Sequence, residues 1–179
     1  MTDRVFVIGG GAMGLSVAIE LARLGMSVVL SDRGQQDGGS SWAGAGILST
    51  LPPWIYAEKI SRLALAGMRA WPSWAEEIEQ SSNISPEFWT CGMKVLQEKD
   101  PQVAMEWSRM HKLVAETESG NIWLPAVSQV RNPRLLAAMK ETALALDTRI
   151  LPNCTVTGFK TENGRIVFAQ TTEGEHPAD

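Results

Sequence analysis

Cysteine, histidine and tyrosine are scarce in this sequence, which has two cysteines, two histidines and one tyrosine in 179 residues. Cys91 and Cys154 stand alone, and their separation fits neither a metal site nor a redox pair. We therefore expect free, buried thiols, a reducing compartment such as the cytoplasm, and no bound metal. His111 and His176 have no partner motif and are interpreted as surface residues, so the sequence identifies no catalytic residue.

Basic clusters and long apolar runs are also missing. The net charge is -4 at pH 7 and lysine and arginine do not cluster, which argues against nucleic acid or an anionic membrane as a partner. No apolar run reaches the length of a transmembrane helix. The opening MTDRVFVIGG enters a predicted strand directly, which leaves no room for a signal peptide. The composition, 44% hydrophobic and 20% charged, is instead typical of a globular protein with a sizeable core.

The stretch from Arg4 to Arg33 has the most informative pattern. Val5–Ile8 is a short apolar run rich in β-branched residues, which predicts a strand buried in a parallel sheet. A helical pattern follows and ends at Gly25, and Ser27–Leu30 predicts a second strand. Asp32 lies just past the end of that strand. The unit is therefore strand, glycine turn, helix, strand and acid.

Three glycines in this unit have G-x-G-x-x-G spacing, and each position favours glycine for a different physical reason. Gly9 permits the tight turn, Gly11 lets a pyrophosphate approach the backbone, and Gly14 lets the helix pack closely on the strand. The free N–H groups at the helix start favour phosphate, and Asp32 is placed to accept ribose hydroxyls. The turn residues predicted to bind a dinucleotide are Gly9, Gly11, Ala12, Met13 and Gly14. The alternative is a glycine-rich turn without a ligand.

A second segment, SSWAGAGIL at Ser40 to Leu48, consists mostly of small residues that allow a ligand to approach the backbone. Together with the first unit, it resembles the glycine oxidase and D-amino-acid oxidase family of flavoproteins, most closely the glycine oxidase (ThiO-like) branch. TCGMKVL at Thr90–Leu96 and IWLPAVSQVRNPRLLAAM at Ile122–Met139 are also similar to that family. The resemblance covers nearly the whole chain. Asp32 is a departure, because the family usually has glutamate there.

The resemblance implies FAD as the cofactor, because nicotinamide-binding domains have no reason to carry the second segment. It implies that this segment lies along the pyrophosphate and the flavin-proximal end of FAD, and that a backbone group near Val156 meets the adenine. The residues that it adds to the cofactor site are Arg33, Ser40, Ser41, Ala45, Gly46, Ile47 and Val156.

The resemblance also implies an activity. The protein would oxidise the CH–NH bond of glycine or of another small amino acid or amine to an imine, with oxygen or a quinone as the electron acceptor and a link to thiamine biosynthesis. Two alternatives stay open: an NAD(P)-dependent dehydrogenase with the same opening, and an inactive nucleotide-binding fragment. The exact amine is also left open, as is the oligomeric state, for which a homo-oligomer is one alternative.

The predicted fold is α/β, with a Rossmann-like FAD-binding parallel sheet and an interposed α+β substrate-side domain. Residues 1–50 and about 149–179 form the FAD-binding domain, and about 51–148 form the substrate-side region. The family continues for about as long again, so we expect this sequence to be truncated before a second half that holds the substrate-carboxylate arginine.

Several elements are predicted from local signals. A helix is expected over Tyr56–Glu79, kinked or divided at Pro72. A second helix follows Asp100-Pro101, and a third runs from Pro133 to Leu146 with Asn132 as its N-cap. Glu116–Asn121 is interpreted as a polar turn, and Asn163-Gly164 as the turn of a β-hairpin.

Overall fold

The computed structural model describes residues 3–34, 39–49 and 52–177 of the chain. The chain forms two compact units, which are described separately below. The first unit comprises Met1–Gly44, Ile78–Pro86 and Asn132–Asp179, and the second comprises Ala45–Glu77 and Glu87–Arg131. The assignment of a cofactor role to one part and a substrate role to the other stays a prediction.

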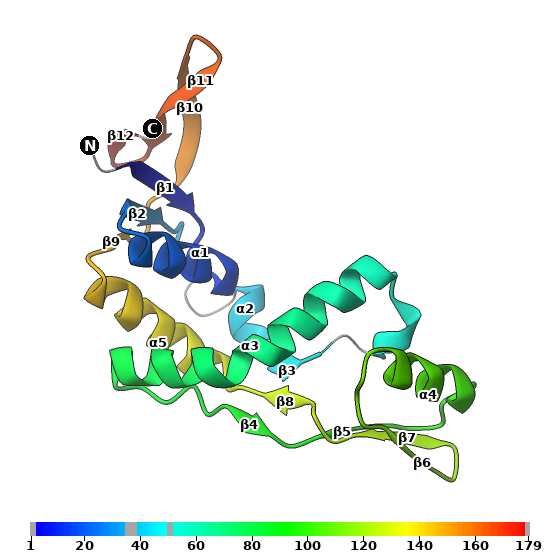
Figure 1. Cartoon of the computed structure of the whole chain (residues 1–179). Helices are drawn as coiled ribbons and strands as arrows, with labels where there is room; N and C mark the ends of the chain where they lie inside the picture. Colours follow the sequence, from blue (N-terminus) through cyan, green and yellow to red (C-terminus); the bar gives the residue numbers. More distant parts are fainter. Residues whose placement is uncertain (1–2, 35–38, 50–51, 178–179) are drawn as a thin grey trace. The chain divides into compact units, whose positions relative to one another are not determined.

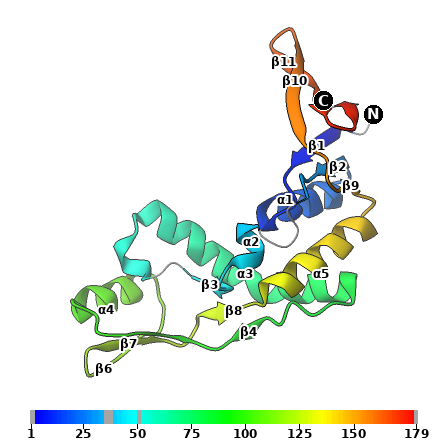
Figure 2. The same cartoon turned by 180° about the vertical axis from the view of Figure 1, so that it is seen from behind.

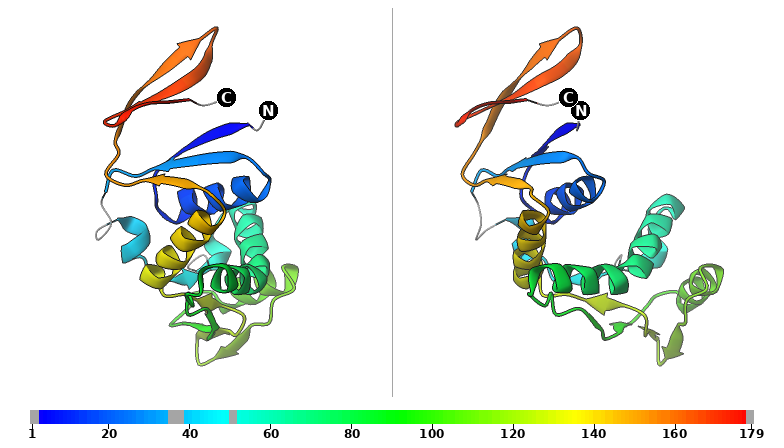
Figure 3. Two further views of the ribbon diagram at one scale, coloured as in Figure 1. Left: turned by 90° about the vertical axis from the view of Figure 1, so that its left-hand side faces the viewer. Right: turned by 60° about the vertical axis from the view of Figure 1, so that its left-hand side comes forward.

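The first unit is built on a parallel sheet with the strand order β1-β2-β9. β1 (Arg4–Ile8) pairs in parallel with β2 (Ser27–Ser31), which pairs in parallel with β9 (Arg149–Leu151). The helix α1 (Ala12–Arg23) connects β1 to β2 and packs against α5 (Asn132–Ala145). Figure 3 shows both helices on one face of this sheet. The predicted parallel α/β architecture is confirmed.

Apolar side chains at helical spacing hold α1 and α5 together. Their packing explains why the helical pattern could be read from the sequence, since one face of each helix is buried and the other is exposed. The buried side chains on the two helices include Leu15, Ala18, Ile19, Leu135, Ala138, Met139 and Ala143.

The other face of the sheet is next to an antiparallel meander, β10 (Val156–Glu162), β11 (Arg165–Thr171) and β12 (Gly174–Pro177). The predicted hairpin is confirmed, because Asn163 and Gly164 between β10 and β11 have φ values of 51° and 76°. β12 is a strand that the sequence analysis missed. Its His176 stacks on the ring of Phe6 in β1 with centroids 5.3 Å apart, so His176 is intermediate in exposure and not the freely exposed surface residue that was expected.

The second unit contains two small antiparallel sheets. β3 (Ile47–Leu48), β8 (Ser128–Gln129) and β4 (Trp89–Thr90) form the first, in the order β3-β8-β4. β5 (Met93–Val95), β7 (Asn121–Leu124) and β6 (Glu116–Glu118) form the second, in the order β5-β7-β6. The predicted turn at 116–121 is therefore partly wrong, because its charged first residues pair with β7 as an edge strand.

Short helices complete the second unit. η1 is the 3-10 helix Pro53–Ile55, and α4 is Pro101–Met110 (Figure 1). Asp100 caps α4 as predicted, since its side chain accepts the Val103 N–H at 3.3 Å. The core cluster of this unit is Trp54, Ala104, Ile122, Leu124 and Val127. The indole of Trp54 satisfies its N–H by donating to Glu98 Oε2 at 3.1 Å.

The helix α3 (Glu58–Ser82) is continuous over 25 residues. It does not end at Pro72, so of the two predicted alternatives only a kink stays open. Among the residues that the structure describes, neither α3 nor any other helix combines the length and the apolar character needed to cross a bilayer.

Replacing Gly67 in α3 with alanine is expected to stabilise the protein. A Cβ built on Gly67 has no atom within 4 Å, so the new methyl group meets open space. Because alanine loses less backbone entropy than glycine in a helix, the free energy of unfolding should rise by about 0.5–1 kcal/mol. Urea denaturation checks this through a higher midpoint at an unchanged slope. A lower midpoint would contradict the geometry of α3 at this position.

Candidate functional site

A cavity of about 820 Å³ lies in the first unit. It opens at the carboxyl ends of the parallel strands, where α/β proteins bind their ligands, and its volume is within the range of small-molecule sites. One wall comes from Ile8 and the glycine turn, a second from Asp32 after β2, and a third from α2 (Ser40–Ala43). α5 and the segment after β9 supply the rest of the lining. Figure 2 shows these elements of the first unit from behind.

The three glycines of the motif differ in what requires them. Gly9 has φ +100°, a conformation that favours glycine, so its predicted role in a tight turn is confirmed. A Cβ at Gly14 would collide with the carbonyl oxygen of Gly9, which confirms the predicted close packing of α1 on β1. Gly11 has φ -75° and ψ -179°, which any residue can adopt. The backbone conformation therefore does not require glycine at position 11, and only the need for free space beside the backbone explains its absence of a side chain.

The N-terminus of α1 faces the glycine turn. α1 has 12 residues, and its N-cap Gly11 has no side chain that could satisfy the first N–H groups. The Ala12 N–H donates to Ser41 Oγ at 3.1 Å, so α2 reaches the start of α1. The positive end of the helix dipole and its N–H groups make this position favourable for phosphate.

Asp32 is held in place through both of its carboxylate oxygens. Oδ2 accepts the Gly10 N–H at 2.7 Å, and Oδ1 accepts the Gly34 N–H at 2.8 Å. Its backbone is fixed as well, because Asp32 N donates to the carbonyl of Leu151 at 3.0 Å. Each carboxylate oxygen can accept a second hydrogen bond, so ribose hydroxyls can still be accepted.

Gly10 is a residue that the motif analysis passed over. A Cβ on Gly10 would lie 3.1 Å from both Cβ and Oδ2 of Asp32, so the middle glycine of the run makes room for the acid. The run of three consecutive glycines was the available signal, because G-x-G-x-x-G itself places no demand on this position.

The structure brings many of the predicted site residues together. Gly9 and Gly11 line the cavity with Asp32 and Arg33. Ser40, Ser41 and Val156 line it as well. Their roles toward FAD stay a prediction, but they share one cavity although they come from four separate parts of the chain.

Other predicted residues do not line this cavity. Ala12, Met13 and Gly14 begin α1, and Met13 is 79% exposed. Ala45, Gly46 and Ile47 belong to the second unit, where Ile47 pairs with Gln129. Val130 N there donates to the carbonyl of Gly46 at 2.9 Å. The predicted cofactor roles of both sets stay predictions.

Sequence reasoning missed the contribution of α5. Pro133, Leu136, Ala137 and Lys140 line the cavity, and nothing in an ordinary amphipathic helix indicates that one turn faces a ligand. Cys154 also lines the cavity and is buried, as expected of a free thiol.

Two side-chain predictions outside the cavity need correction. Cys91 is not fully buried but intermediate in exposure. His111 is not a surface residue, because its side chain is only 9% exposed and its ring lies 4.5 Å from that of Trp107. Its Nε2 lies 3.4 Å from Glu58 Oε2 in the second unit.

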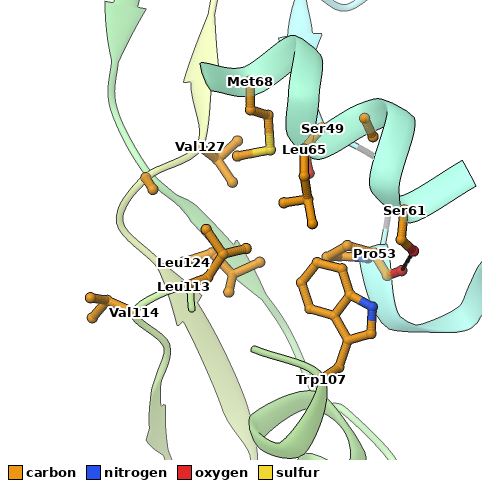
Figure 4. A pocket seen from close by; sticks show the side chains of 12 residues that line it. Ser49, Pro53, Ser61, Leu65, Met68, Trp107, Leu113, Val114, Leu124 and Val127 are labelled. Carbon is orange, nitrogen blue, oxygen red and sulfur yellow. Dashed lines mark hydrogen bonds between the residues drawn. The ribbon is translucent and has the colours of Figure 1, made fainter. Parts of the chain in front are cut away.

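The second unit has a much smaller cavity, of about 10 Å³, which Figure 4 shows between α3, Trp107 and the strands. Leu65, Met68, Leu124 and Val127 point into it, so it is a gap in the apolar core. Its volume is about that of one water molecule, which is too small for an amino acid. Among the described residues no cluster of histidine, cysteine or acidic side chains could hold a metal ion.

The family model "FAD dependent oxidoreductase" (DAO) matches residues 4–179. The chain belongs to this family. FAD is the cofactor of the family. Of the two cofactors considered, the flavin is therefore supported and the nicotinamide dinucleotide is not.

Individual relatives agree with this assignment. The chain is 34% identical to the glycine oxidase of Pseudomonas putida over 100% of its own length and 54% of the relative's length. It is 26% identical to the bifunctional protein ThiO/ThiG of Trichormus variabilis, over 97% of this chain and 29% of that protein. The structure of glycine oxidase from Geobacillus kaustophilus superposes with a TM-score of 0.88 at 22% identity, over 99% of this chain and 54% of that one, which shows the same fold. The chain thus spans about half the length of the glycine oxidases it matches.

Proposed function

We propose that the protein is a glycine oxidase-like enzyme that oxidises the CH–NH bond of glycine, or of another small amino acid or amine, to an imine. The names of its relatives support this proposal, since they include glycine oxidase and a ThiO/ThiG protein. The second name supports a link to thiamine biosynthesis. Oxygen or a quinone would accept the electrons.

The observation that carries the proposal is the cavity at the carboxyl ends of β1 and β2. It combines a bare glycine turn, a helix N-terminus and a fixed carboxylate, which are the features that suit pyrophosphate and ribose. The residues present therefore fit the adenosine half of FAD. We assign the pyrophosphate to the turn at Gly9 and Gly11, the ribose to Asp32, and the adenine to the segment around Val156.

Bound FAD supplies the hydride acceptor for such an oxidation. The residues of this chain bind and orient the cofactor. Asp32 stays in place because Gly10 and Gly34 donate to it, and the turn stays close to the sheet because Gly14 has no side chain. Rigid placement of these groups lowers the entropy that is lost when the cofactor binds.

A binding experiment tests the cofactor part of the proposal. Residues 1–179 are expected to bind FAD and ADP by calorimetry, since both share the adenosine and pyrophosphate groups, and to bind NADP poorly because its 2′-phosphate would meet the Asp32 carboxylate. Binding of NADP as tight as that of FAD would contradict the assignment of Asp32.

An activity assay tests the oxidation part. Glycine, sarcosine and D-alanine are offered, together with FAD, to a version of the protein extended to the length of the glycine oxidases it matches, and peroxide release or dye reduction is measured. Peroxide indicates oxygen as the acceptor, whereas reduction of a quinone-like dye alone indicates a dehydrogenase. Residues 1–179 alone are expected to bind FAD without turnover. Turnover by these residues would show that they already hold a substrate site.

A further inference from the structure

Asn132, the first residue of α5, makes a hydrogen bond across a large sequence distance. Its Nδ2 donates to the backbone carbonyl of Ser41 in α2, 91 residues away in the sequence, at 2.7 Å. Neither its helix-start signal nor the glycine motif predicts this contact. The half-buried carboxamide therefore ties the start of α5 to α2 within the first unit.

Gly44, directly after α2, leaves the space that this carboxamide occupies. A Cβ on Gly44 would collide with Asn132 Nδ2. Gly44 has φ -63° and ψ 151°, so its backbone conformation is open to any residue. Space for Asn132, and not backbone conformation, accounts for the glycine.

Ser41 extends the connection to the phosphate turn. Its hydroxyl accepts the Ala12 N–H at 3.1 Å, and a Cβ on Gly11 would lie 3.0 Å from Ser41 Oγ. One residue of α2 thus contacts both the first residue of α5 and the start of α1. α2 has only four residues and no side-chain cap, so its position depends on such outside contacts.

We propose that Asn132 is a positioning residue for the cofactor: by holding the carbonyl of Ser41, it places the Ser41 hydroxyl at the N-terminus of α1. This inference rests on the proposed binding of the adenosine half of FAD in the same cavity. Ser41 lines that cavity, and Asn132 does not. The effect of Asn132 on the nucleotide therefore passes through Ser41.

The variant Asn132→Asp separates this role from a role in the helix start. Aspartate keeps the size and one side-chain oxygen and is favourable in the first turn of a helix, so α5 should not lose stability. It removes the N–H donor and sets an oxygen against the carbonyl of Ser41. The dissociation constant of ADP, measured by calorimetry, should rise about tenfold in a protein that circular dichroism shows to be folded, while the melting temperature should fall by no more than the loss of one hydrogen bond explains.

Two controls address the added negative charge. Asn163→Asp makes the same exchange in the β10–β11 turn, where aspartate tolerates the positive φ of 51°, and should leave ADP binding unchanged. Gly44→Ala is uncharged and displaces the Asn132 carboxamide, so it should weaken ADP binding in the same direction as Asn132→Asp. The loss in Asn132→Asp should also persist in about 0.5 M NaCl, where charge repulsion is screened.

A double-mutant cycle decides whether the effect passes through Ser41. In a Ser41→Ala background, Asn132→Asp should no longer weaken ADP binding, because the hydroxyl that it positions is gone. ADP affinity within twofold of wild type in Asn132→Asp and Gly44→Ala, or full additivity with Ser41→Ala, would overturn the inference while leaving the proposed function intact. Wild-type protein that binds neither ADP nor FAD would overturn both.

Discussion

Replacing Gly14 with alanine is expected to destabilise the first unit and to abolish nucleotide binding. The added Cβ would collide with the carbonyl oxygen of Gly9 and would lie 3.0 Å from the Gly9 carbonyl carbon. Both atoms belong to the backbone of the turn, so neither can rotate away. Either α1 shifts from β1 or the turn deforms, and overpacking of this kind costs about 1–3 kcal/mol.

Gly67→Ala is the matched comparison for this variant. Both exchanges add one methyl group to a helix, where alanine is intrinsically favoured over glycine. The two positions differ in their surroundings, because Gly67 faces open space and Gly14 faces backbone. Opposite signs in urea denaturation are expected, and stabilisation by both alanines would show that α1 is not packed on the turn as described.

The first unit could be predicted well because its signals are local and strong. The apolar run Val5–Ile8, the glycines and Asp32 lie within about one strand–helix–strand unit, and each glycine answers a steric demand of that unit. The structure adds which demand applies: conformation at Gly9, helix packing at Gly14 and free space at Gly11.

The contacts between distant segments could not be predicted. Residues of α5 line the cavity because one turn of this regular amphipathic helix faces α2. The hydrophobic periodicity of the sequence does not indicate which turn that is. The bond from Asn132 to Ser41 joins two helix starts whose own signals are complete without it. Sequence patterns report local structure, whereas these contacts are tertiary.

Short elements with charged residues were also hard to predict. β6 contains Glu116 and Glu118, which are unfavourable in a strand by propensity, and pairing with β7 overrides that preference. His111 and His176 were misjudged for a related reason. A lone polar residue in a polar stretch resembles a surface residue, but Trp107 and Phe6 provide aromatic surfaces for these two rings.

Replacing Gly11 with valine is expected to abolish nucleotide binding while the fold persists. The backbone of Gly11 is extended, so valine is not strained by its φ and ψ. Its Cβ would already lie 3.0 Å from Ser41 Oγ, and the two γ-methyl groups must then enter the space in front of the turn. That is the space assigned to the pyrophosphate. The dissociation constants of FAD and ADP should therefore rise at least about 100-fold, which is a loss of roughly 2.7 kcal/mol.

Calorimetric titration with ADP, combined with circular dichroism, separates this effect from unfolding. Gly67→Val makes the same exchange in a helix of the second unit where a Cβ meets no atom within 4 Å, and it should bind ADP like the wild type. A folded Gly11→Val protein that retains FAD at normal stoichiometry would rule out the turn as the phosphate site. Gly10 and Gly34 would still hold Asp32 in place, and its role toward the ribose would then depend on the NADP comparison alone.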